Sequence, residues 1–269
     1  MNKKIHSNDR LQYLKKMRRE KIKVYILQGV LLIACFGIWE LLAQIGVIDG
    51  FITSQPSRVY QTLRGMVSED LYLHILTTCY ETIVGFLLGV LIGILIASLL
   101  WWFPTFAKIC DPYLVVLNAL PKIALGPIII IMVGAGTNAI IVMALAISLI
   151  TTVLQMYNGF FHTDQEKCKM IEAFGATKWQ LFSKVVFPSN LATLFNSMKI
   201  NIGLSLVGVI AGEFLVSKAG LGYLIVYGGQ VFRMDLVMTS VLILAVVAAI
   251  LYVAVSLLEK YAVKWINHR

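Results

Sequence analysis

Long apolar runs separated by short polar segments dominate the chain. Residues 24–47 form one such run, interrupted only by Glu40, and residues 77–101 form a second that closes on Trp101 and Trp102. A helix needs about 20 apolar residues to cross the hydrocarbon core of a bilayer. Both runs are therefore predicted to be transmembrane helices, and the two tryptophans suit the membrane interface.

The next apolar stretch is too long for a single helix. No Asp, Glu, Lys or Arg occurs from Ile123 to Thr163, and the glycine-rich residues 134–138 can form a turn within it. The pattern therefore predicts four further spans, at residues 110–133, 138–158, 190–214 and 236–258. Together these runs predict an all-α integral membrane protein with six transmembrane helices.

The composition supports this class. Of the 269 residues, 59% are hydrophobic and 14% charged, whereas soluble domains have about 45–50% apolar and about 25% charged residues. The net charge of +9 does not indicate nucleic-acid binding, because nine Lys and Arg lie within residues 1–23, directly before the first run. The four cysteines and four histidines are scattered, so we expect neither a metal site nor a disulfide framework.

The distribution of Lys and Arg predicts the orientation. If the N-terminus is cytoplasmic, the cytoplasmic segments hold 17 of these residues and the outer segments only four. This asymmetry follows the positive-inside rule, which places both termini in the cytoplasm. The predicted organisation is a basic segment at 1–23, a six-helix transmembrane domain at 24–258 and a cytoplasmic tail at 259–269.

Small residues recur every four positions in the second span. They lie on one face of the predicted helix, where they would let another backbone approach closely. The neighbour could belong to the same chain or to another subunit. The face comprises Glu81, Gly85, Gly89, Gly93 and Ala97.

The connection between the fourth and fifth spans, residues 163–188, is polar but keeps a helical rhythm. Two short amphipathic helices joined at Gly175 are predicted, since glycine can bend the backbone there. Pro188 is expected to end the second helix, and Ser189 or Asn190 to cap the fifth span. The apolar positions are Met170, Ala173 and Phe174, then Trp179, Phe182 and Val186.

Trp179 and Phe182 are expected to be exposed on the second of these helices. Exposed apolar side chains on a cytoplasmic segment favour a docking element for another protein. The alternative interpretation is a helix that lies in the lipid interface.

The same segment resembles the cytoplasmic signature of ABC-importer permeases in the spacing of Gly175, Val185, Phe187 and Pro188. The piece "EAFGATKWQLFSKVVFP" is similar to the branch that serves nitrate, sulfonate and taurine. "WELLAQIGVI", "LPKIALGPIIIIMVGAG" and "AGEFLVSKAGLGYLI" agree with that branch in order, so the resemblance covers nearly all of residues 30–258.

The resemblance has two departures. The Glu-Ala-Ala that gives the signature its name falls on Lys169, Met170 and Ile171, so no contact of that Glu is carried over. Ala192 stands where relatives often have a second proline. Neither departure removes the glycine or the helical pattern.

The resemblance implies a type I ABC importer permease fold with cytoplasmic coupling helices, in a bacterial cell membrane. It implies a second permease subunit, expected to be identical, a cytoplasmic ABC ATPase dimer and an extracytoplasmic substrate-binding protein. ATP and magnesium would be bound by the ATPase, with no cofactor in this chain. The residues implied to couple to the ATPase are Glu172, Ala173, Gly175, Ala176, Trp179, Phe182 and Pro188.

The function predicted is a non-enzymatic pore subunit. The chain has no Gly-Lys dipeptide and hence no phosphate-binding loop of the Walker type. A secondary transporter is the first alternative, with Glu40, Glu81 and Glu213 as ion-coupling candidates, although each lies near the end of its span. The second alternative is an intramembrane enzyme, for which no catalytic constellation is found.

The candidate translocation path comprises Lys122, Lys199 and Glu213. Charges within a span usually face protein or a water-filled path, and cationic groups would suit a sulfonate-like anion. Lys199 is also close enough to the cytoplasmic end to extend to the interface instead. A neutral heterocycle such as a pyrimidine or vitamin precursor is therefore the alternative substrate.

Overall fold

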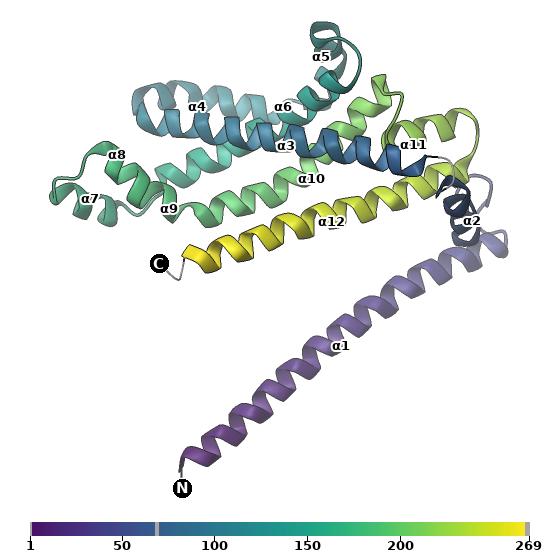
Figure 1. The fold of residues 1–269 in the computed structure, drawn as a ribbon, viewed down its shortest axis with the longest axis horizontal. Helices are drawn as coiled ribbons and strands as arrows, with labels where there is room; N and C mark the ends of the chain where they lie inside the picture. The colour runs from purple at the N-terminus through teal and green to yellow at the C-terminus, as the bar shows by residue number, and fades with distance from the viewer. Residues whose placement is uncertain (1, 68–69, 267–269) are drawn as a thin grey trace. The chain divides into compact units, whose positions relative to one another are not determined.

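The computed structural model describes residues 2–67 and 70–266, and no strand occurs among them. The chain divides into two compact units, residues 1–64 and 65–269. The first unit contains the 43-residue helix α1 (Asn2–Gln44) and most of α2 (Pro56–Val67) (Figure 1). The basic segment that precedes the first predicted span is therefore part of the same helix as that span.

The second unit is a helical bundle in which α3, α6 and α10 pack on one another and α12 packs on α10 (Figure 1). Short helices join α6 to α10 at one end of the bundle, and α11 joins α10 to α12. The bundle helices are α3 (Leu71–Trp102), α4 (Pro104–Ala119), η1 (Lys122–Leu125), α5 (Gly126–Val133), α6 (Thr137–Phe161), α10 (Leu191–Val216), α11 (Leu221–Gln230) and α12 (Met234–Ile266).

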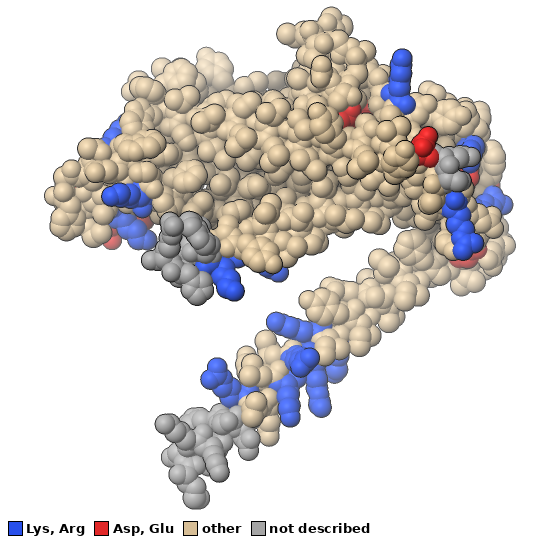
Figure 2. Space-filling model, in the orientation of Figure 1, with Lys and Arg blue, Asp and Glu red and all other residues tan. Residues whose placement is uncertain are grey.

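Five described helices are long and apolar enough to cross a membrane, and a bent helix pair raises the number to six if it counts as one span. This agrees with the six predicted spans. Figure 2 shows Lys and Arg gathered on the N-terminal half of α1 and towards the ends of the second unit, with no Lys or Arg on most of the visible surface between those ends. The predicted tail from residue 259 is helical as far as Ile266, and Arg269 lies outside the described residues.

The prediction of one continuous third helix over residues 110–133 is wrong. Helices α4 and η1–α5 meet at an angle of 88°. Leu120, between them, is extended with ψ 139°, because the ring of a following proline, here Pro121, disfavours the helical conformation of the residue before it. The bend divides this apolar run into two half-length helices.

The small-residue face of α3 packs inside the chain, against α6. A Cβ atom built on Gly85 would lie 2.6 Å from the Ala144 side chain, and one built on Gly93 would lie 2.7 Å from Thr152. Larger side chains could not occupy these positions without separating the two helices. The structure thus decides for an intrachain role of this face, which sequence left open.

Candidate functional site: the segment between α6 and α10

The segment begins with α7 (Gln165–Ala173), and Asp164 caps it. The Asp164 carboxylate accepts hydrogen bonds from the backbone N–H groups of Glu166 at 3.0 Å and Lys167 at 3.4 Å. The bond from Glu166 is the main reason that the pKa of Asp164 lies below its ordinary value. A carboxylate at this position satisfies N–H groups that have no partner within the helix.

Gly175 ends α7 in the left-handed conformation, with φ +80°. Its N–H bonds the Glu172 carbonyl at 2.9 Å, and the Ala176 N–H bonds the Ile171 carbonyl at 3.3 Å. This is the Schellman arrangement, in which glycine avoids the penalty that a Cβ atom would bring. The prediction of two short helices joined at Gly175 is confirmed.

Thr177 starts α8 (Lys178–Leu181) with a capping box. Its N–H donates to the Gln180 side chain at 2.8 Å, while its own hydroxyl accepts from the Gln180 N–H at 3.3 Å. Sequence reasoning missed this motif, although the Thr-x-x-Gln spacing of residues 177–180 indicates it. The turn between the two helices is therefore fixed on both sides.

Pro188 does not end the second helix, so that prediction is wrong. The helix continues from α8 through a π-helical turn, η2 (Phe182–Val186), into α9 (Phe187–Ser189). Proline lacks the N–H that an α-helix would pair with the fourth residue back, and the Phe187 N–H already bonds one residue further back, at Phe182. The wider turn lets the helix pass through the proline.

Asn190 holds the two ends of the segment together. It occupies the N-cap position of α10 but makes no capping bond, contrary to the sequence expectation. Its side-chain amide donates instead to the Thr163 hydroxyl at 2.8 Å and to the Val186 carbonyl at 2.9 Å, and both Asn190 and Thr163 are buried. This Asn190 clasp joins Asn190 to Thr163, 27 residues earlier. The short helices therefore form a loop that leaves and rejoins the bundle at one place.

An aromatic cluster fixes α8 against the ends of α3 and α6. Phe182 lies 5.0 Å from Trp101 and 5.4 Å from Phe160, measured between ring centroids. The Lys178 ammonium donates to the Trp102 carbonyl and lies 5.3 Å from the centroid of that indole ring. The expectation that Phe182 is exposed is wrong, because its side chain is buried in this cluster.

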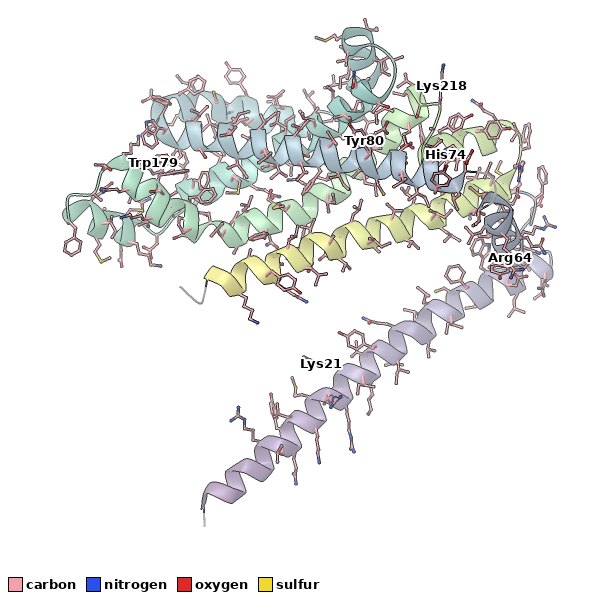
Figure 3. All side chains as sticks on the ribbon, viewed as in Figure 1. Lys21, Arg64, His74, Tyr80, Trp179 and Lys218 are labelled. Atoms are coloured by element: carbon pink, nitrogen blue, oxygen red, sulfur yellow. The ribbon has the colours of Figure 1, made fainter. Side chains whose placement is uncertain are left out.

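The outer surface of the segment is apolar. Trp179 is 65% exposed and Phe174 is 82% exposed. The exposed aromatic residues of the segment are therefore Trp179 and Phe174, whereas Trp179 and Phe182 were predicted. Trp179 also contacts Trp102, at 6.3 Å between ring centroids, and lies at the end of the bundle that carries the segment (Figure 3). Of the other residues expected to couple, Ala176 is half-buried, and the following are exposed: Glu172, Ala173, Gly175 and Pro188.

Beneath this surface lies a cavity of about 380 Å³. It is lined by residues of α7 and of the ends of α3 and α6, and its lining includes Trp101, Phe160, Cys168 and Lys178. Burial raises the pKa of the Cys168 thiol above its ordinary value. Cys168 itself packs in the same apolar cluster as Phe160, so α7 contacts the bundle beside the cavity.

The three predicted path residues do not come together. Lys199 forms an ion pair of 2.7 Å with Glu259 of α12, and both side chains are largely buried. Lys122 lies at the bend after α4, where its ammonium donates to the Asn118 carbonyl at 2.8 Å. Glu213 is buried at the other end of α10, where it accepts a hydrogen bond from Thr78. Sequence reasoning missed Glu259, which lies one residue beyond the predicted end of the sixth span.

Comparisons with known proteins give a consistent result. A family model described as "Binding-protein-dependent transport system inner membrane component" matches residues 89–268. The taurine transport system permease protein TauC of Escherichia coli is 23% identical, over 98% of this chain and 97% of its own length. The formylaminopyrimidine transport permease protein ThiX of Halalkalibacterium halodurans is 24% identical, over 85% of this chain and 91% of its own length.

A solved structure supports the architecture. The bundle is similar to a chain of the MetNI methionine ABC transporter in an inward-facing conformation, with a TM-score of 0.64. The match covers 71% of this chain and 95% of that one at 19% sequence identity. At this identity the similarity concerns the fold alone.

Proposed function

The chain belongs to the family of binding-protein-dependent transport system inner membrane components and is the permease subunit of an ABC importer, and we propose that it carries a small organic solute into the cytoplasm by alternating access. The permease fold is of type I, and the family is a membrane component rather than an enzyme. The solute would arrive on an extracytoplasmic binding protein.

We propose that residues 163–188, between α6 and α10, couple the permease to its ATPase, and we call them the coupling segment. The observation that carries this proposal is the exposed apolar surface of the segment. Trp179 and Phe174 project from a turn fixed by the Gly175 C-cap and the Thr177 capping box. Aromatic side chains held in this way suit an interface, since they are ordered before the partner arrives. The partner is a cytoplasmic ABC ATPase, whose closure on ATP would push the segment and, through the Asn190 clasp, the ends of α6 and α10.

The assembly proposed has two copies of this chain, one ATPase dimer and one binding protein. ATP and magnesium belong to the ATPase. Both termini and the coupling segment lie in the cytoplasm, which the excess of Lys and Arg in these segments supports. The membrane is the bacterial cell membrane.

A sulfonate-like anion is the first candidate for the solute, because taurine, whose name the E. coli relative carries, bears a sulfonate group. A neutral heterocycle is the second candidate, and one structural observation favours it. The Lys199 ammonium is neutralised by Glu259 at 2.7 Å, so it offers no free positive charge to an anion in this conformation.

The test uses this chain assembled with its ATPase and binding protein in lipid nanodiscs. Sulfonates and pyrimidines are first screened for ligands that raise the melting temperature of the binding protein. A true ligand should then stimulate ATP hydrolysis by the complete complex and should not do so without the binding protein. In intact cells that express the complex, uptake that stops when the proton gradient alone is collapsed, at normal ATP, would overturn the proposal in favour of a secondary transporter.

A further inference from the structure

Two carboxyl groups are buried together at the end of the bundle opposite the coupling segment. Glu81 of α3 has no exposed surface and Glu213 of α10 is 2% exposed. The two carboxyl groups are near enough to act on one another electrostatically. In Figure 3, His74 marks this end of α3 and Trp179 marks the other end of the bundle.

Glu213 has partners that suit an ionised carboxylate. The Thr78 hydroxyl donates to it at 2.6 Å, and the Gly222 N–H donates to it at 2.5 Å. Gly222 is the second residue of α11, whose first N–H groups have no partner within the helix and favour a negative charge. The Leu221 N–H donates to the Thr78 hydroxyl at 2.8 Å. Glu213 therefore joins α3, α10 and α11 through its charged form.

Glu81 has no comparable set of donors. Neither of its carboxyl oxygens meets the geometry of a hydrogen bond with a group in the described part of the chain. The polar groups that face it are the Glu213 carboxyl and the Thr137 hydroxyl of α6. Burying a charge without a partner is costly, and two carboxylates that share a site cannot both ionise. The arrangement is therefore incomplete unless Glu81 carries a proton or the pair holds a cation.

We propose that Glu81 and Glu213 form a proton site that holds one proton within the bundle. The proton resides on Glu81, whose O–H donates to the Glu213 carboxylate. No bond to carbon forms or breaks, and the proton is exchanged with water. Protonation turns a repulsion between α3 and α10 into a hydrogen bond, and Glu213 stays available to hold the start of α11. Loss of the proton loosens this three-helix junction.

Other titratable groups lie around the junction. His74 of α3 accepts a hydrogen bond at Nδ1 from the Gly220 N–H at 3.0 Å and stacks on Tyr223 of α11, at 6.1 Å between ring centroids. Asp70 precedes α3 and acts electrostatically on His74. Protonation of His74 at Nδ1 would remove the bond to Gly220, so acid would disturb this end by a second route. The test is therefore carried out from pH 7 to pH 9, above the range in which a histidine ordinarily takes up a proton.

The proton site has a defined signature in stability. The folded chain holds a proton that a glutamic acid in the unfolded chain releases at neutral pH, so folding takes up one proton. Stability must then fall as pH rises, by up to about tenfold in the unfolding equilibrium constant per pH unit. If both carboxyl groups were ionised in the folded chain, folding would take up no proton and stability would show no such slope.

Infrared spectroscopy of the full-length chain in nanodiscs tests the proposal directly. The wild type at pH 7.5 is expected to show the C=O stretch of a protonated carboxyl group, shifted in D₂O. Glu81→Gln should lose this band and flatten the fall in melting temperature between pH 7 and pH 9. Glu259→Gln, which removes a glutamate that is paired with Lys199, is the matched control and should keep both properties.

Glu81→Asp keeps an acid at this position, so its band should remain but at a changed frequency, even if Glu81→Gln fails to fold. A band and a pH slope that persist unchanged in Glu81→Gln, or a band whose frequency is unchanged in Glu81→Asp, would overturn the proposal. So would a wild type that lacks the band and gains stability in NaCl over KCl, since the pair would then hold a metal cation in place of the proton.

Discussion

Replacing Trp179 with Ala is expected to weaken binding of the ATPase without destabilising the permease. The indole is 65% exposed and packs on the chain through its contact with Trp102. Most of the side chain is therefore available to a partner. The permease loses little when it is truncated, whereas the interface loses an aromatic anchor.

The size of the effect follows from the exposed area. A Trp buries about 200 Å² when it is fully covered, so an indole that is 65% exposed offers about 130 Å². At about 25 cal/mol per Å² this area contributes about 3 kcal/mol, and ordering the side chain costs about 1 kcal/mol. The remaining loss of about 2 kcal/mol corresponds to about 30-fold in the dissociation constant.

The assay is a titration of nanodisc-embedded permease with the purified ATPase, together with a melting curve of each permease variant. Tyr72→Ala is the matched control, because Tyr72 is also 65% exposed but belongs to the opposite end of α3. Phe182→Ala should behave differently, lowering the stability of the permease itself by about 3–5 kcal/mol, since this ring is buried in the aromatic cluster. Wild-type ATPase affinity in Trp179→Ala would refute the coupling assignment and favour a helix that lies in the lipid interface.

Three further predictions follow from the same structure. Gly175→Val should keep membrane insertion but reduce co-purification of the ATPase, because a β-branched residue is strained at φ +80°; full retention would mean that this turn is not part of the coupling element. In a cysteine-free background, Ser57→Cys should react with an impermeant maleimide in intact cells and Lys178→Cys should not, and equal labelling would contradict the six-span orientation. The Cys168 thiol, whose pKa burial raises, should be alkylated more slowly at pH 8 in the folded chain than in urea, because less thiolate is present until the pH exceeds the raised pKa; equal rates would show that the thiol is not buried.

Much of the fold was predictable from the sequence because a bilayer imposes one simple constraint. Apolar runs of sufficient length must become helices there, since every backbone polar group needs a partner within the segment. The six spans, the close packing along Gly85 and Gly93, and the turn at Gly175 all follow from local pattern of this kind. The excess of Lys and Arg in the predicted cytoplasmic segments likewise requires only a count along the chain.

The candidate site was only partly predictable. Local rules located the coupling segment and its turn and put Phe174 among the apolar positions of the first helix, but they wrongly placed Phe182 on the surface. Helical spacing cannot tell which of two apolar rings faces the bundle, because that depends on Trp101 and Phe160, which come from other helices. The passage of the helix through Pro188 depends on a π-helical turn. It was missed because such turns have no short sequence signature.

The sequence by itself determined what each segment is: six apolar spans, one amphipathic connection and a family signature within it. Only the tertiary structure decided which polar groups meet. Lys199 pairs with Glu259 across 60 residues of chain, Asn190 with Thr163, and Glu81 with Glu213. The physical reason is that hydrophobicity and helix formation act over a few neighbouring residues, whereas the state of a buried charge depends on the atoms that other helices bring to it.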